Sequence, residues 1–264
     1  MKITRSGLAV ALLTAFLFTG CESKQAKAPA PSQADLEANL SGDQKMMAFS
    51  LSGFEKTGKK KWEVQGKSAD IVSEVVNLTD VVAKAYGDQT DMTLTADKGS
   101  FNRATNDAHF ESNVVVSGTN GTEMKTDALD WKNAEQKVMT DKPVEMKSEA
   151  KGKIEGEFAT KTPTTITCDG PMEIDYGKSY AVFNKNVQVN DDRGLLSCDT
   201  ATAYYDTKTK QVSKIVARGN VKIKREGSWT YSDEATYLAP EQKVILTGSP
   251  KVMIYPDQAK AAKK

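Results

Sequence analysis

An internal repeat constrains the fold of this 264-residue chain more than any other feature. The stretch 126–138 aligns with the stretch 232–244, and both copies contain the sequence Glu-Gln-Lys-Val. Each copy then reaches a proline, Pro143 or Pro250. Such self-similarity is typical of folds in which copies of one supersecondary unit stack and bury each other's apolar faces.

Shorter anchors recur in the same order between these copies. An apolar residue begins a four-residue stretch that ends in aspartate at 94–97, 166–169 and 196–199. Each aspartate is followed 16 to 21 residues later by Asn-Val, at Asn113, Asn186 and Asn220. A three-part pattern that keeps its order indicates units of about 30 residues.

The segments between the anchors alternate apolar and polar residues, which is the period of a half-buried β-strand. Asn120-Gly121 is a strong hairpin signal, and Thr57-Gly58, Tyr176-Gly177 and Glu226-Gly227 are weaker turn signals. The stretch 71–86 has a partly helical spacing, but its β-branched content favours strand. Short strands and evenly spaced turns predict an all-β sandwich, jelly roll or solenoid.

The N-terminus has the pattern of a bacterial lipoprotein signal. Lys2 and Arg5 precede a short apolar run, and the sequence 17–21 resembles a lipobox that ends in Cys21. We therefore predict a signal peptide over 1–20, a lipid anchor at Cys21 and a flexible tether over 21–46. An uncleaved signal anchor is the alternative, and 257–264 are a polar tail. The net charge of +1 argues against nucleic-acid binding.

At the family level, the run 49–70 followed by 94–97 resembles the lipopolysaccharide-export protein LptC. The segments 165–176, 204–206 and 218–221 resemble the OstA-like domain of LptA. This resemblance predicts an LptC-like β-jelly roll over 47–160 and an LptA-like one over 161–256, stacked as an elongated all-β scaffold. It also implies that 71–86 is mainly strand.

The resemblance implies periplasmic lipopolysaccharide transport. It also implies that an inner-membrane ABC transporter delivers the lipid and that acyl chains lie in a hydrophobic groove. Further OstA-like proteins are then expected to pair by their strand edges toward the outer membrane. LptC proteins usually hold the membrane with a helix, whereas this chain has Cys21, and Glu22 leans toward inner-membrane retention. LptC and LptA are usually separate chains. The rival hypothesis is an assembly scaffold that pairs by its edges and carries no lipid.

Alternation predicts which side chains face the groove, although such positions also fill any closed β-core. The first half contributes Trp62, Val64, Leu94, Phe110, Val114, Val116, Leu129 and Trp131. The second half contributes Met172, Ile174, Phe183, Val187, Val189, Ile215, Val221 and Ile223.

The remaining polar candidates favour structural roles. Cys168 and Cys198 occupy equivalent repeat positions, so they form either a disulfide between neighbouring strands or two small buried residues. The aspartates recur once per unit and are expected to cap a turn rather than bind a metal, and they are Asp70, Asp97, Asp169, Asp199 and Asp233. His109 is the only histidine. Without a catalytic motif, we expect no enzyme, cofactor or metal site.

Overall fold

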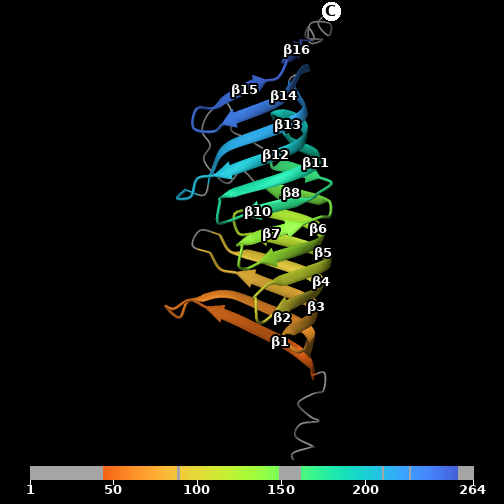
Figure 1. The fold of residues 1–264 in the computed structure, drawn as a ribbon, viewed down its shortest axis with the longest axis vertical. Helices are drawn as coiled ribbons and strands as arrows, with labels where there is room; N and C mark the ends of the chain where they lie inside the picture. Colours follow the sequence, from red (N-terminus) through yellow and green to blue (C-terminus); the bar gives the residue numbers. More distant parts are fainter. Residues whose placement is uncertain (1–43, 88–89, 149–161, 210, 226, 255–264) are drawn as a thin grey trace, which may run out of the picture. The chain divides into compact units, whose positions relative to one another are not determined.

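The computed structural model describes residues 44–87, 90–148, 162–209, 211–225 and 227–254. Over these residues the chain forms one sheet of sixteen antiparallel strands, which confirms the predicted all-β class (Figure 1). The strands are β1 (Gln44–Phe54), β2 (Lys60–Val72), β3 (Val75–Ala85), β4 (Met92–Asn102), β5 (Ala108–Gly118), β6 (Thr122–Lys132), β7 (Lys137–Thr140), β8 (Val144–Ser148), β9 (Thr164–Cys168), β10 (Met172–Asp175), β11 (Tyr180–Asp191), β12 (Gly194–Tyr205), β13 (Val212–Arg225), β14 (Ser228–Leu238), β15 (Lys243–Thr247) and β16 (Lys251–Met253).

The strands follow one another in the sheet in chain order. Consecutive hairpins run from β1 to β7, and the path then continues from β7 through β10 to β15. The short strands β8, β9 and β16 pair beside this path, β8 with β6 and β9, β9 with β11, and β16 with β14. Within the described part of the chain, no helix has the length and apolarity needed to span a membrane.

Most long strands bend in the middle, and the bends fold the sheet into two facing leaves. At the bends of β5, β11 and β13 the pairing register shifts, and Asn113, Asn186 and Asn220 adopt positive φ values of 52°, 49° and 47°. Asparagine tolerates this left-handed conformation better than most residues. We call leaf 1 the part that contains β8, β9 and β16, and leaf 2 the part that contains β7, β10 and β15.

Three strands are split into two pieces instead of bent. Asp141-Lys142-Pro143 separates β7 from β8, Asp169-Gly170-Pro171 separates β9 from β10, and Gly248-Ser249-Pro250 separates β15 from β16. Proline has no N–H to donate to a ladder, so it interrupts a strand at its own position. The split strand β7–β8 is the last strand of the first half. The split strand β9–β10 is the first strand of the second half, and β15–β16 is its last described strand.

A single apolar core runs between the leaves. One cluster of contacting buried side chains extends from Val64 on β2 to Ala235 on β14 and includes Met172 and Val187, which are almost fully buried. The two halves therefore share one core instead of forming two separate ones. Burial of this apolar surface is the main favourable contribution to folding.

The described turns and strands lie where most of the local signals predict them, and Glu226 of the predicted turn Glu226-Gly227 lies outside the described residues. Turns lie at Thr57-Gly58, Asn120-Gly121 and Tyr176-Gly177, and 71–86 lies in β2, a turn and β3, as expected. The boundary of the tether is wrong by three residues, because β1 already begins at Gln44. The signal peptide, Cys21, the rest of the tether and the tail lie outside the described residues.

Candidate functional site

The described part of the second half contains an open apolar cleft between the leaves, which we call the C-terminal cleft. Leaf 1 supplies Val189, Leu196 and Ile223, and leaf 2 supplies Ile215 and Val244. Ala217 and Ala235 line its floor, and the cavity has a volume of about 190 Å³. Small floor side chains leave space between two otherwise bulky walls.

Polar side chains gather at one end of this cleft, where β11 turns into β12. Arg193 Nε donates to Asp191 Oδ1 and Oδ2 at 3.1 and 3.0 Å, and Arg193 Nη2 also donates to Oδ2. Burial raises the pKa of Asp191, but the hydrogen bonds from Arg193 outweigh burial and lower it overall. The carboxylate is therefore ionised at neutral pH and holds the guanidinium in place. Arg225 and Tyr237 also line this end.

The predicted groove residues divide between the core and the cleft. Val64, Phe110, Val114, Leu129, Met172, Phe183, Val187 and Val221 are buried in the core cluster, and Trp62, Leu94, Val116, Ile174, Val189 and Ile223 pack against it. Ile215 lies in the C-terminal cleft with Val189 and Ile223. Trp131 lies instead beside Tyr176, with ring centroids 6.3 Å apart. All the predicted residues except Trp131 thus lie in the core, against it or in the cleft, and three of them line open space.

Family models match the chain in tandem. The model "Lipopolysaccharide-assembly, LptC-related" matches residues 8–157, more than half of the chain. The chain belongs to this LptC-related family. A second model, "LptA/(LptD N-terminal domain) LPS transport protein", matches residues 165–263, so an LptC-like part and an LptA-like part are fused. No curated protein matches the chain.

Among solved structures, the chain is similar to the crystal structure of LptH from Pseudomonas aeruginosa, described as the LptA homologous periplasmic component of its lipopolysaccharide transport device. The identity is 13%, the match covers 62% of this chain and 95% of that chain, and the TM-score is 0.34.

Two free cysteines are buried in the core of this LptC-related chain. Cys198 pairs with Val187 of β11, while Cys168 follows Thr167, which pairs with Gln188 of the same strand. Because β11 lies between them, the cysteines are two strand spacings apart, roughly 9.6 Å. A disulfide needs a Cα separation below about 7 Å. The possible disulfide is therefore wrong, and the alternative of two small buried residues holds.

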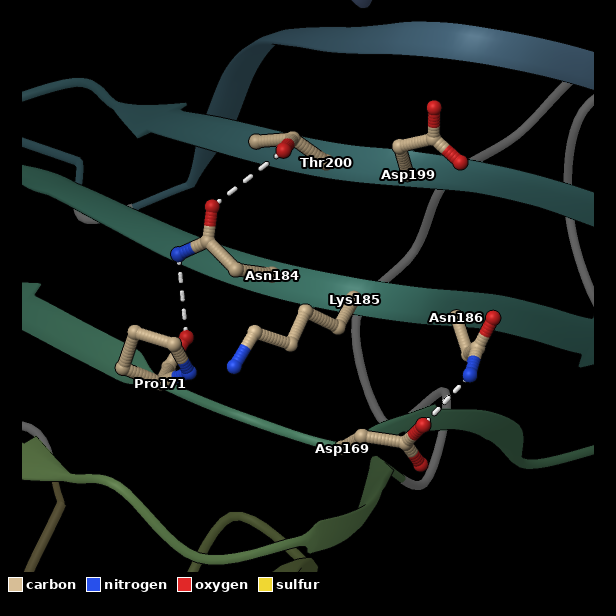
Figure 2. Close-up of a pocket in the computed structure, with 7 residues that line it drawn as sticks. All are labelled: Asp169, Pro171, Asn184, Lys185, Asn186, Asp199 and Thr200. Atoms are coloured by element: carbon tan, nitrogen blue, oxygen red, sulfur yellow. Dashed lines mark hydrogen bonds between the residues drawn. The ribbon is translucent and has the colours of Figure 1, made fainter.

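The repeated aspartates hold the strand bends. Asn113 Nδ2 donates to Asp97 at 2.7 Å, Asn220 Nδ2 donates to Asp199 at 2.8 Å, and Asn186 donates likewise to Asp169. Figure 2 shows Asn186 and Asp169 in a polar depression, where Lys185 of β11 also lies. Asp97, Asp169 and Asp199 thus each accept a hydrogen bond at a bend, whereas the same role for Asp70 stays a prediction. Asp233 follows a related pattern, since a Cβ built on Gly248 lies 2.3 Å from its carboxylate.

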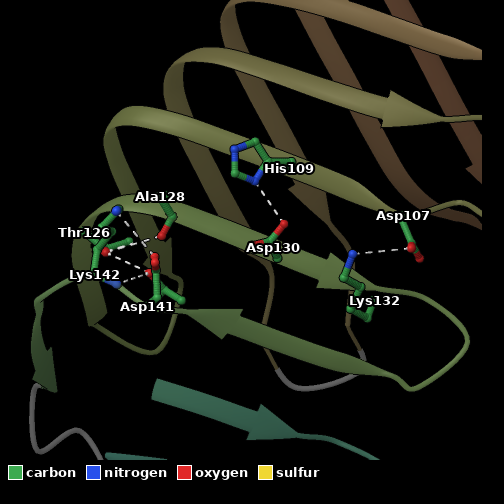
Figure 3. A network of polar contacts seen from close by, with 9 residues as sticks. Asp107, His109, Thr126, Ala128, Asp130, Lys132, Asp141 and Lys142 are labelled. Atoms are coloured by element: carbon green, nitrogen blue, oxygen red, sulfur yellow. Dashed lines mark hydrogen bonds and ion pairs between the residues drawn. The ribbon is translucent and has the colours of Figure 1, made fainter. Parts of the chain in front are cut away.

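His109 lies in a polar network on neighbouring strands (Figure 3). Its Nδ1 lies 2.9 Å from Asp130 Oδ1, across the β5–β6 pair. Nearby, Lys132 Nζ lies 3.7 Å from Asp107. These contacts tie adjacent strands together, and both members of each pair are partly exposed.

Sequence reasoning missed the basic end of the C-terminal cleft. Arg193 lies in the turn between β11 and β12, which the alternation of β-strands does not describe, Arg225 is the polar last residue of β13, and Tyr237 comes from the opposite leaf. The available signal was the Arg193-Gly194 pair between two apolar strand runs, which marks a tight turn with a cation.

Proposed function

We propose that this chain carries lipopolysaccharide through the periplasm and holds lipid A acyl chains between the two leaves. The observation that supports this function best is the C-terminal cleft, whose apolar walls come from both leaves. An acyl chain gains about 0.8 kcal/mol for each methylene that it buries. Such a site retains lipid without covalent chemistry, so we propose a carrier and not an enzyme.

The cleft opens further when it is loaded. Its volume of about 190 Å³ is below the roughly 300 Å³ of the smallest typical ligand pockets. Several acyl chains therefore require the leaves to separate. When the leaves separate, apolar side chains on their inner faces lose their contacts with the opposite leaf. The acyl chains then cover these side chains.

A photo-crosslinking residue at position 223 tests the carrier function in cells. Ile223 faces the cleft, whereas its neighbour Lys222 is exposed on the opposite face of β13. We expect lipopolysaccharide adducts from position 223 and none from position 222. If neither position 223 nor position 215 ever yields a lipid adduct, the edge-pairing scaffold without lipid is the better description.

The N-terminus completes the proposal. We infer that Cys21 is lipidated after removal of 1–20 and anchors the chain in the periplasm, with the inner membrane favoured by Glu22. The LptC-like part then receives lipid from the inner-membrane ABC transporter, and the LptA-like part passes it toward the outer membrane. Mass spectrometry of the membrane-extracted chain tests the anchor, and an unmodified Cys21 rules it out.

The seam between the halves is a template for edge pairing with further OstA-like bridge proteins. β7 pairs with β10 and β8 pairs with β9, so one split strand lies against another. The last described strand is split in the same way into β15 and β16, and it exposes Val244, Ile245, Val252 and Met253. We propose that a split first strand of a bridge protein covers this edge, opposite Val244 as Ile174 lies opposite Val138.

A photo-crosslinker at position 245 tests the edge contact. We expect it to trap another protein of the bridge, because Ile245 lies on the outermost described strand of the path. The matched control is Val138, whose strand is already covered by β10. Equal trapping from both positions argues against a specific edge.

A further inference from the structure

The mouth of the C-terminal cleft places two arginines on either side of a glycine. Arg193 and Gly194 follow β11 and begin β12, and Arg225 ends the neighbouring strand β13. Gly194 has a φ of 139°, and a Cβ built on it lies 1.9 Å from the carbonyl oxygen of Lys224 and 3.3 Å from Cγ of Arg225. The missing side chain at position 194 lets the end of β13 lie directly against the turn.

The cation at this turn is held by a buried partner. The Asp191 side chain is 4% exposed and the Arg193 side chain is 32% exposed. The carboxylate thus lies inside while part of the guanidinium reaches the surface. The hydrogen bonds from Arg193 to Asp191 hold the arginine side chain in one conformation, although such a side chain is otherwise flexible. Arg193 and Arg225 line this end of the cleft, and Asp191 is the one carboxylate among its described lining residues. The ammonium of Lys224 lies over the ring of Trp229 on the outer face of β13, and the neighbouring Asp192 acts electrostatically on Arg193.

Apolar walls begin next to these charges. Arg225 and Ile223 are two residues apart on β13, so their side chains share a face at a spacing of roughly 7 Å. Leu196 lies opposite Ile223 in the register of β12 and β13. A molecule that fits both parts has an anionic group at one end and acyl chains at the other. The planar guanidinium matches phosphate especially well, because it can donate two parallel hydrogen bonds.

We propose that Arg193 and Arg225 bind a phosphate of a phosphorylated, acylated lipid whose chains enter the C-terminal cleft beside them. This inference rests on the proposed carrier function, and it adds the chemistry of the head group and the end of the cleft at which it lies. The charge of this end selects phosphorylated over uncharged lipids of the same chain length.

Two short-chain probes test this selection on the full chain: dioctanoyl phosphatidic acid and uncharged dioctanoylglycerol. We expect Arg225→Gln to weaken binding of the phosphorylated probe about tenfold, as for one charge-assisted phosphate contact, and to leave the uncharged probe unchanged. The matched control is Lys222→Gln, which removes the same charge from the outer face of the same strand and is expected to change neither affinity. The double variant Arg193→Gln/Asp191→Asn removes the second cation without leaving an unpaired carboxylate, and we expect it to act in the same direction.

Each result has a distinct meaning. Equal losses in Arg225→Gln and Lys222→Gln indicate general electrostatics and overturn the site, as does an equal loss for both probes. Inorganic phosphate is the third ligand, and binding as tight as that of the phosphorylated lipid assigns the arginines to free phosphate instead. If wild-type chain binds neither lipid, the carrier function itself fails. Binding of both lipids with equal affinity removes only the head-group inference.

Discussion

The indole of Trp62 contacts the ring of Phe101 with centroids 5.7 Å apart, although the two residues lie far apart in the sheet. By strand register Trp62 lies opposite Ala85, and Phe101 lies opposite Val76, nearly the full length of β3 away. The contact therefore spans the space between leaf 1 and leaf 2. It closes the inner face near β2 and β4, whereas the C-terminal cleft is open.

Gly53→Ala is expected to break this contact. A Cβ at position 53 lies 2.2 Å from Nε1 of Trp62, so the indole has to move. In a chain whose other tryptophans are replaced by phenylalanine, we expect a red-shifted emission of Trp62. The free energy of unfolding should fall by about 1–2 kcal/mol, as for a lost aromatic pair. Gly177→Ala is the control, because its new Cβ meets its nearest atom at 3.4 Å. An unchanged Trp62 spectrum contradicts the prediction.

Asn220→Ala should destabilise the chain more than Asn220→Gly. Both variants lose the hydrogen bond to Asp199, which contributes about 1 kcal/mol. In Asn220→Ala the free energy of unfolding should fall by roughly another 1 kcal/mol. Residue 220 has a φ of 47°, which glycine adopts freely and alanine does not. Urea unfolding of both variants measures the difference, and Asp199→Ala gives the value of the hydrogen bond alone. Equal stability of the two Asn220 variants means that the bend does not need a left-handed residue.

Stability should decrease at alkaline pH because of Cys198. Burial in the core raises the pKa of its thiol to about 11, and neighbouring Asp199 adds to this rise. The unfolded chain releases the same proton near pH 8.5, so rising pH favours the unfolded state from there to about pH 11. Unfolding free energies measured across this window should fall less steeply in Cys198→Ala than in wild type. If the unfolding free energies of the two proteins fall equally with pH, the raised pKa of Cys198 is contradicted.

Lys137→Met should weaken the seam between the halves. Lys137 Nζ lies 3.3 Å from Glu173 and 3.9 Å from Asp175, whose side chain is only 3% exposed. Its removal leaves a buried carboxylate with less compensation, for a loss of about 1–3 kcal/mol. Lys132→Met removes an ion pair between two more exposed side chains and should cost less than about 1 kcal/mol. Thermal or urea unfolding compares the two variants, and similar losses show that the seam gains nothing special from Lys137.

The sequence predicts much of the fold because alternation carries direct information about faces. The period of two predicts that Val187 and Val221 face inward, and both are almost fully buried. The repeated Asn-Val pairs mark equivalent positions, but they do not predict the left-handed geometry of the asparagines, since a repeat shows that a position matters and not which dihedral angles it adopts. Asparagine next to an apolar strand residue was the signal for it.

The cysteines and the cleft show what a linear pattern leaves out. Equivalent positions suggested neighbouring strands for Cys168 and Cys198, but the repeating unit includes the return strand β11, which separates them. The cleft joins Ile223 and Ile215, which share one strand yet lie on opposite leaves. Only the bend at Gly219-Asn220 brings them to face each other, and the alternation of a straight strand does not contain it.

The pairing of β7 and β8 with β10 and β9 has a consequence for assembly at low abundance. Two strands of one chain meet at an effective concentration in the millimolar range when a short linker joins them. This joint therefore survives any dilution of the protein, whereas the joints that we propose at the outer edges depend on the supply of partners. Under the proposed function, fusing the halves removes one concentration-dependent step from the assembly of the bridge and leaves only the joints at the two ends sensitive to concentration.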